Sequence, residues 1–175
     1  MITKYTKFRD IPQLIIAPYR VDCSFDGLRR YTDEYELDLN PDFQRYYVWT
    51  EKQKTEYIEW VLRGGKSGRD LYFNHPGWMN NFKGDFVVVD GKQRLSAVFD
   101  FLDNKIKAYG SFLSEYEDRL NFMTASLSVN IANLKTRKEV LQWYIQLNTG
   151  GTAHTDDELE KVRELLKKED SNHLK

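Results

Sequence analysis

The sequence predicts a mixed α/β fold of the α+β kind, with helices dominating the second half of the chain. Two patterns carry this prediction. Short apolar runs indicate strands, and at four positions a Ser or Thr is followed three residues later by Glu or Gln, which is typical of a helix start. With 175 residues, 41% of them hydrophobic, the chain is long enough for one self-sufficient core. We expect one domain over residues 1–160, followed by the end of the last helix and a polar tail over 161–175.

Four strands are expected. Leu14–Ile16 and Leu71–Phe73 are short apolar runs, and Phe86–Val89 is a continuous run rich in β-branched residues, typical of a buried strand. Between Leu127 and Ile131 apolar residues alternate with polar ones, which is also typical of a strand.

The expected helices follow four capping pairs, in which the hydroxyl accepts a backbone N–H and the longer side chain reaches back. The pairs are Thr50/Gln53, Ser114/Glu117, Thr136/Glu139 and Thr155/Glu158. The first helix runs over 51–63 and stops at Gly64 and Gly65. A further helix over 92–103 carries the clearest apolar stripe, formed by Leu95, Val98, Phe99 and Leu102.

Composition excludes several classes of protein. The single cysteine, Cys23, rules out a disulfide framework and a multi-cysteine zinc site. No apolar run approaches the roughly 18 residues that span a bilayer, and the first ten residues lack an apolar signal core, so we expect a cytoplasmic protein without a membrane partner. The 26 basic and 27 acidic residues give a net charge of -1, which argues against avid, nonspecific DNA binding.

The stretch Asp90-Gly91-Lys92-Gln93-Arg94 joins a buried strand to a helix through a glycine turn. The first turn of such a helix offers unpaired N–H groups and the positive end of the helix dipole, which suits a phosphate. Asp90, at the strand end, is placed to hold a magnesium ion or to orient a water. The alternative is an ordinary Asp-Gly turn in which Lys92 and Arg94 are solvated and Asp90 caps the helix.

Two other stretches could contribute to a site. In residues 40–49, four aromatics surround Gln44 and Arg45, so this segment could stack on and hydrogen-bond a base; the alternative is core packing with a structural salt bridge from Arg45. Asn148 opens a glycine-containing loop over 148–152, which either lets a ligand approach the backbone or only ends a helix. The run Gly64–Gly68 is not a P-loop, because a helix precedes it and the upstream glycine is missing.

Taken in order, Phe43-Gln44-Arg45 with Tyr47-Val48-Trp49, then Asp90–Leu95, then Asn148–Gly151 resemble the amino-terminal domain of GmrSD-type restriction and anti-phage proteins. That family is known by a DGQQR motif and is related to the ParB/sulfiredoxin fold. The resemblance runs from about residue 10 to residue 160. It implies a ParB/sulfiredoxin-like small mixed sheet with flanking helices, and a domain that binds and hydrolyses a nucleoside triphosphate with Mg²⁺.

The resemblance also implies roles for particular residues. Catalysis falls to Asp90, Gln93 and Arg94, with Asp90 as the metal ligand. Nucleotide binding falls to Gln44, Arg45, Gly91, Lys92, Gln93, Arg94 and Asn148. Lys92 departs from the family motif, where a Gln is usual; it keeps a donor near the phosphates but adds a charge.

The chain stops where these relatives continue into a helical linker and a His-Asn-His nuclease domain. The expectation is therefore a truncated copy, a free-standing nucleotide-responsive protein, or one that works with a separate nuclease or effector chain, with a homo-oligomer also open. Two alternatives to the triphosphatase remain: a ParB-like module that binds or cleaves DNA, and a non-catalytic regulator that binds a partner protein.

Overall fold

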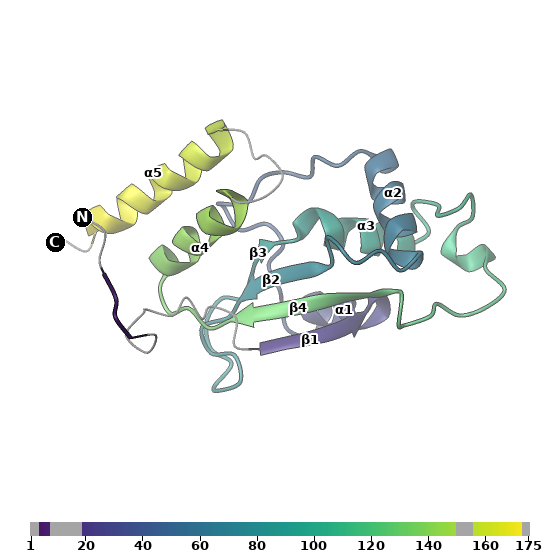
Figure 1. The fold of residues 1–175 in the computed structure, drawn as a ribbon, viewed down its shortest axis with the longest axis horizontal. Helices are drawn as coiled ribbons and strands as arrows, with labels where there is room; N and C mark the ends of the chain where they lie inside the picture. Colours follow the sequence, from purple (N-terminus) through teal and green to yellow (C-terminus); the bar gives the residue numbers. More distant parts are fainter. Residues whose placement is uncertain (1–3, 8–18, 150–155, 173–175) are drawn as a thin grey trace.

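The structure is a computed structural model that describes residues 4–7, 19–149 and 156–172, and it confirms the mixed α/β fold. Its sheet contains β1 (Tyr19–Ser24), β4 (Ser126–Ala132), β2 (Asp70–Asn74) and β3 (Val87–Asp90), side by side in that order (Figure 1). The outer pairs β1–β4 and β2–β3 are antiparallel, and the central pair β4–β2 is parallel.

Helices cover both faces of this sheet. On one face α1 (Phe25–Asp33), α2 (Glu51–Leu62) and α3 (Lys92–Leu102) enclose the larger core. On the other, α4 (Arg137–Thr149) and α5 (Asp156–Asn172) pack together and enclose a second core (Figure 1). The predicted run at 86–89 is apolar throughout because β3 lies between them: Val88 belongs to the first core and Val89 to the second.

Because β4 lies inside the sheet, its polar residues are buried, unlike the polar residues of a strand with one face in solvent. Ser128 and Asn130 alternate with the predicted apolar residues, yet both are buried. The Asn130 amide is satisfied inside the sheet, because its Nδ2 donates to the Leu71 backbone oxygen (3.2 Å) and to the Asp70 carboxylate (3.2 Å).

Two of the four predicted capping pairs are confirmed. At the start of α2, Gln53 N–H donates to the Thr50 hydroxyl (3.3 Å) and Thr50 N–H donates to the Gln53 side chain (2.9 Å). At the start of α4, Thr136 N–H donates to the Glu139 carboxylate (2.9 Å), and such bonds hold the pKa of Glu139 below its usual value. The pair at Thr155 lies outside the described residues.

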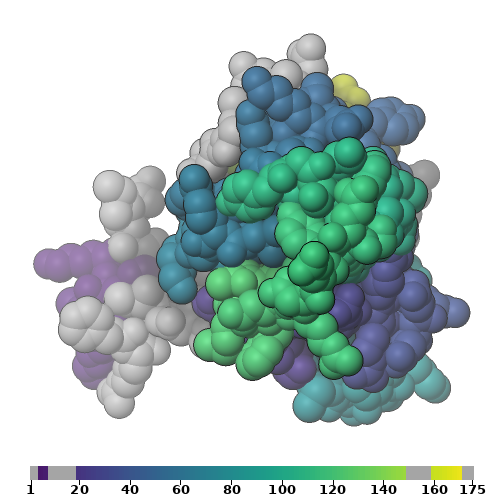
Figure 2. Space-filling view, turned by 90° about the vertical axis from the view of Figure 1, so that its right-hand side faces the viewer, coloured from purple at the N-terminus to yellow at the C-terminus, as the bar shows by residue number. Residues whose placement is uncertain are grey.

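The prediction of a helix that begins at Ser114 and Glu117 is wrong. The chain makes only a short 3₁₀ turn at Leu113–Glu115, in which the Phe112 N–H donates to the Glu115 carboxylate (2.7 Å) and the Ser114 N–H donates to Asn104 (2.8 Å). This turn belongs to the connection between α3 and β4, which lies across the surface shown in Figure 2 and exposes Tyr109, Phe122 and Met123.

The sequence did not predict β1 or α1, and the strand expected at Leu14–Ile16 lies outside the described residues. Helix α1 begins at Ser24, whose hydroxyl accepts from Gly27 N–H (3.2 Å). Helix α1 was missed because the third residue after Ser24 is a glycine, which cannot reach back to complete a capping box. None of the helices described here is long and apolar enough to cross a membrane.

Candidate functional site

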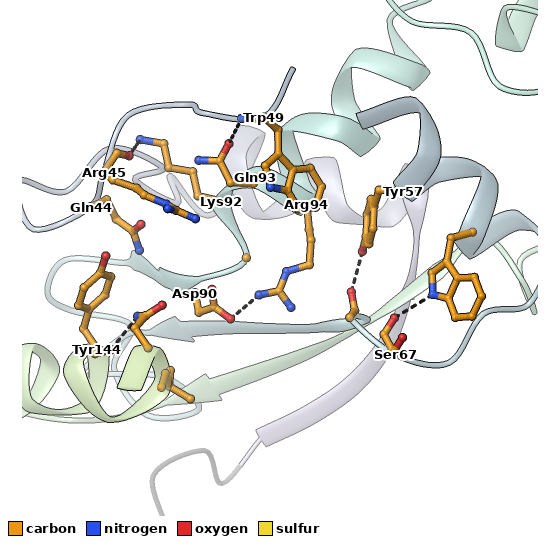
Figure 3. A pocket seen from close by; sticks show the side chains of 15 residues that line it. Gln44, Arg45, Trp49, Tyr57, Ser67, Asp90, Lys92, Gln93, Arg94 and Tyr144 are labelled. Carbon is orange, nitrogen blue, oxygen red and sulfur yellow. Dashed lines mark hydrogen bonds and ion pairs between the residues drawn. The ribbon is translucent and has the colours of Figure 1, made fainter. Parts of the chain in front are cut away.

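Every site residue predicted from the sequence lines one pocket of about 450 Å³, at the carboxyl end of β3 where α3 begins. Figure 3 shows Asp90 and Arg94 meeting in the middle of this pocket, with Gln44 on one side and Tyr57 on the other. The predicted members are Gln44, Arg45, Asp90, Gly91, Lys92, Gln93, Arg94 and Asn148. The convergence brings together segments that are about 50 residues apart or more in the chain.

Gly91 forms the turn from β3 into α3. It occupies the N-cap position with a left-handed φ of 104°, and no side chain of the described residues accepts the first N–H groups of α3. The first intrahelical bond runs from Leu95 N–H to the Gly91 oxygen (2.9 Å), which leaves the N–H groups of the first turn at the pocket. Asp90 is therefore not the helix cap, and the alternative interpretation of this carboxylate is wrong.

Gly91→Ala is expected to lower the free energy of unfolding by about 2–3 kcal/mol, because alanine resists a left-handed φ and also overpacks the core. An added Cβ would lie 2.4 Å from the Leu71 Cδ2 atom, and Leu71 is fully buried in the sheet. Gly110→Ala is the matched control: its φ of 85° is also left-handed, but its Cβ would meet nothing within 4 Å. Chemical denaturation of both variants measures the difference, and equal losses would contradict the close approach at Gly91.

Arg94 and Asp90 form the charged centre of the pocket. The Arg94 guanidinium pairs with the Asp90 carboxylate and donates to the Asp70 backbone oxygen (2.7 Å), so it is held by β2 and β3 together. The side chains of Arg94 and Asp90 are 18% and 30% exposed, so both remain within reach of a ligand. The cation that balances Asp90 in this structure is thus Arg94.

The long polar side chains beside this pair hold the segment 44–49 in place. Lys92 Nζ donates to the Arg45 backbone oxygen (2.8 Å) and lies 4.5 Å from the centre of the Tyr47 ring. Burial lowers the pKa of Lys92. Lys92 therefore joins helix α3 to this segment.

Gln93 and Gln44 act on the backbone in the same way. The Gln93 side-chain oxygen accepts from the N–H groups of Val48 (3.0 Å) and Trp49 (3.3 Å), and its Nε2 donates to Tyr46 (3.0 Å). Gln44 Nε2 donates to the backbone oxygens of β3 at Val89 (2.8 Å) and Val88 (3.2 Å). The structure therefore shows both amides binding protein backbone at the rim of the pocket.

An aromatic wall formed by Trp49 and by two rings of α2 completes the pocket. The sequence indicated Trp49 as a possible stacking residue but did not indicate Tyr57 or Trp60. Trp49 lies beside Tyr57, with ring centres 5.3 Å apart. The Tyr57 hydroxyl donates to the Gly68 oxygen (2.9 Å), and the Trp60 indole donates to the Ser67 oxygen (3.2 Å). The run 64–68 is not a P-loop, since it joins helix α2 to strand β2, but its glycines were a signal that backbone approaches the pocket here.

Helix α4 supplies the remaining wall through Tyr144, Leu147 and Asn148. Tyr144 is buried against Phe43, with ring centres 5.3 Å apart, and Asn148 Nδ2 donates to the Tyr144 backbone oxygen (2.7 Å). The glycine loop that follows Asn148 lies outside the described residues.

The charge of the pocket suits an anion. Its described lining includes the three cations Arg45, Lys92 and Arg94 and one carboxylate, Asp90. No group of three His, Cys, Asp or Glu side chains within metal-binding reach occurs in the described residues. A single carboxylate is nevertheless a common protein contribution to Mg²⁺, which takes its other ligands from substrate phosphates and water.

Comparison with known proteins identifies one family. The model of the GmrSD restriction endonuclease, N-terminal domain, matches residues 27–165, which is more than half of the chain. A search of curated proteins and a search of solved structures gave no match. The matched range contains every residue that the sequence assigned to the site.

Proposed function

The chain belongs to the family of GmrSD restriction endonuclease N-terminal domains, and we propose that its pocket binds and hydrolyses a nucleoside triphosphate with Mg²⁺. The family relates the chain to restriction and anti-phage systems. The observation that carries the proposal is the convergence of a helix terminus without a side-chain cap, Arg94 and Asp90 in one pocket of about 450 Å³. We place this activity in the cytoplasm.

The phosphates bind at the amino terminus of α3. Its first N–H groups have no acceptor among the described side chains, and the helix dipole adds a positive partial charge there. Arg94 is the cation best placed to contact them, since its guanidinium is already fixed by the Asp70 oxygen and the Asp90 carboxylate. Because this geometry exists before the ligand arrives, little ordering is needed when charge develops on the transferred phosphoryl group.

Asp90 is the residue that would hold Mg²⁺. A carboxylate that lies near phosphates is repelled unless a cation lies between them, and Arg94 supplies only one positive charge. Mg²⁺ bound with the nucleotide neutralises phosphate charge and orients the groups that react.

The base lies on the side of the pocket formed by Trp49, Tyr57 and Trp60. Ring faces offer a base a stacking partner. Gln93 is a positioning residue, because its amide fixes the backbone of Val48 and Trp49 and thereby the position of the Trp49 ring.

Thermal unfolding with added ligand tests the proposal. A ligand at 100 times its dissociation constant stabilises the native state by about 2.7 kcal/mol, which is a rise in Tm of roughly 5–10 °C for a domain of this size. We expect that rise with a nucleoside triphosphate and Mg²⁺, accompanied by phosphate release, and no comparable rise with double-stranded DNA or the nucleoside alone.

Two results would contradict the proposal. A shift with DNA but with no triphosphate would favour a ParB-like module that binds or cleaves DNA. The absence of any shift, for all four triphosphates and for DNA, would favour a non-catalytic protein that binds a partner or effector chain.

A further inference from the structure

The segment 44–49 forms one rim of the pocket proposed for the triphosphate. Gln44, Arg45 and Trp49 line that pocket. Tyr47 lies between them in the chain but does not line it, and the Tyr47 side chain is 46% exposed. The position of this segment decides where Arg45 and Trp49 lie relative to a ligand, so the contacts that hold the segment bear on binding.

Under this segment lies the buried ammonium group of Lys92. The residue is 5% exposed, and its Nζ reaches the Arg45 backbone oxygen (2.8 Å; Figure 3). Lys92 makes no ion pair in the described part of the chain, and the attraction of the Asp38 carboxylate is weaker than the effect of burial, which lowers the pKa of Lys92. A buried charge without an ion-pair partner raises the free energy of the native state, so a group that stabilises this ammonium also fixes the segment.

The Tyr47 ring is such a group. Lys92 Nζ lies 4.5 Å from the ring centre, and Lys54 Nζ, on α2, lies 5.9 Å from it. Lys54 is itself fixed to α3, because its Nζ donates to the Ser96 hydroxyl (2.9 Å) and to the Asp100 carboxylate (2.6 Å). Burial, and to a smaller extent Asp100, raise the pKa of Tyr47, so the phenol stays neutral at pH 7. The ring thus joins the segment to α2 and α3 through two cation–π contacts.

We propose that Tyr47 is a positioning residue of the triphosphate site, whose ring holds Arg45 and Trp49 at the rim of the pocket through Lys92 and Lys54. This role, which rests on the proposed function, belongs to the ring face, because the Tyr47 hydroxyl makes no hydrogen bond within the described residues. A segment that is fixed before the ligand arrives loses less conformational freedom on binding. Loss of the ring contacts therefore lowers affinity and leaves the rate of the bound complex unchanged.

The variants Tyr47→Phe and Tyr47→Leu separate the ring face from the hydroxyl and from apolar bulk. Phenylalanine keeps the face that attracts an ammonium group, whereas leucine does not. With Mg²⁺ and whichever of the four ribonucleoside triphosphates gives the largest rise in Tm, we expect native affinity for Tyr47→Phe and about fivefold weaker binding for Tyr47→Leu. In Tyr47→Leu the KM for phosphate release should rise by a similar factor while kcat stays native, because Arg94 and Asp90 are unchanged.

Amide hydrogen exchange reports on the segment in the absence of nucleotide. The N–H groups of Val48 and Trp49 donate to the Gln93 side chain, so their exchange shows whether the segment stays against α3. We expect both amides to exchange about fivefold faster in Tyr47→Leu than in the native chain or in Tyr47→Phe. Tyr46→Leu is the matched control: the same substitution one residue away, at a ring that is 89% exposed and makes no cation–π contact in the described part of the chain. It should change neither exchange nor affinity.

A double-mutant cycle with Lys92→Met identifies the partner of the ring. Methionine removes the ammonium group, so in that background Tyr47→Leu should lose most of its effect on the exchange of the Val48 and Trp49 amides. Native affinity in Tyr47→Leu, equal losses in the Phe and Leu variants, additive effects in the cycle, or a fall in kcat with KM unchanged would overturn the role of Tyr47 and leave the proposed function intact. A native chain that binds none of the four triphosphates would instead contradict the proposed function, and this role with it.

Discussion

Arg94→Ala is expected to weaken binding of the Mg²⁺-triphosphate about 1,000-fold, equivalent to about 4 kcal/mol. Each charge-assisted hydrogen bond from a guanidinium to a phosphate contributes about 1.5–3 kcal/mol, and a guanidinium can form two of them at once. The variant also leaves the Asp90 carboxylate without its cation beside the phosphates, so the lost attraction is replaced by repulsion. Isothermal titration with the nucleotide that gives the largest thermal shift measures the effect.

The matched control is Arg29→Ala. Arg29 also pairs with one carboxylate, that of Asp103, and donates to one backbone oxygen, that of Phe99, but it does not line the pocket. Both variants should lose a similar, small amount of stability, of the order of 1–2 kcal/mol for the lost hydrogen bonds. If Arg94→Ala unfolds the protein and Arg29→Ala does not, the role of Arg94 is structural. If both bind nucleotide with native affinity, the phosphates lie elsewhere.

The local parts of the site could be predicted because their signals are contiguous. A buried β-branched run, a glycine and an amphipathic stripe follow one another over Phe86–Leu102, and this order alone indicates a helix terminus at the end of a strand. The structure confirms this order, since β3 ends at Asp90 and α3 begins at Lys92. Val88 and Val89 face opposite sides of the sheet, one in each core.

The functions of the individual side chains could not be predicted in this way, because their partners are distant in sequence. In the sequence, Gln44, Lys92 and Gln93 look like ligand-binding groups. In the structure, the side chain of each bonds a backbone group 44–47 residues away. The pairing depends on how the segment 44–49 folds over α3. No periodicity or capping signal contains that information.

The same reason explains the residues that were missed. Tyr57 and Trp60 lie on α2 with helical spacing that indicates only core packing, and they reach the pocket because α2 packs on α3. The Ser114 pair shows the opposite error. A capping box is a local preference of about 1 kcal/mol, and tertiary bonds such as that of Ser114 N–H to Asn104 can override it.

Asp90→Asn is expected to reduce Mg²⁺-dependent phosphate release about 1,000-fold while leaving the Tm within about 2 °C of the native value. Asparagine keeps an oxygen that can accept from Arg94, so the guanidinium stays in position. What the substitution removes is the negative charge that a hard divalent cation requires. Binding of the triphosphate in EDTA should be unchanged or tighter, because a like charge beside the phosphates is gone.

Comparison with Asp103→Asn separates loss of a cation site from loss of an ion pair. Asp103 is 35% exposed and pairs with Arg29, much as Asp90 is 30% exposed and pairs with Arg94, but it lies outside the pocket. Asp103→Asn should therefore release phosphate at the native rate. If Asp90→Asn also does so at saturating Mg²⁺, then Asp90 serves only to orient Arg94, and the reaction depends on the arginine and the helix terminus without a carboxylate ligand for the cation.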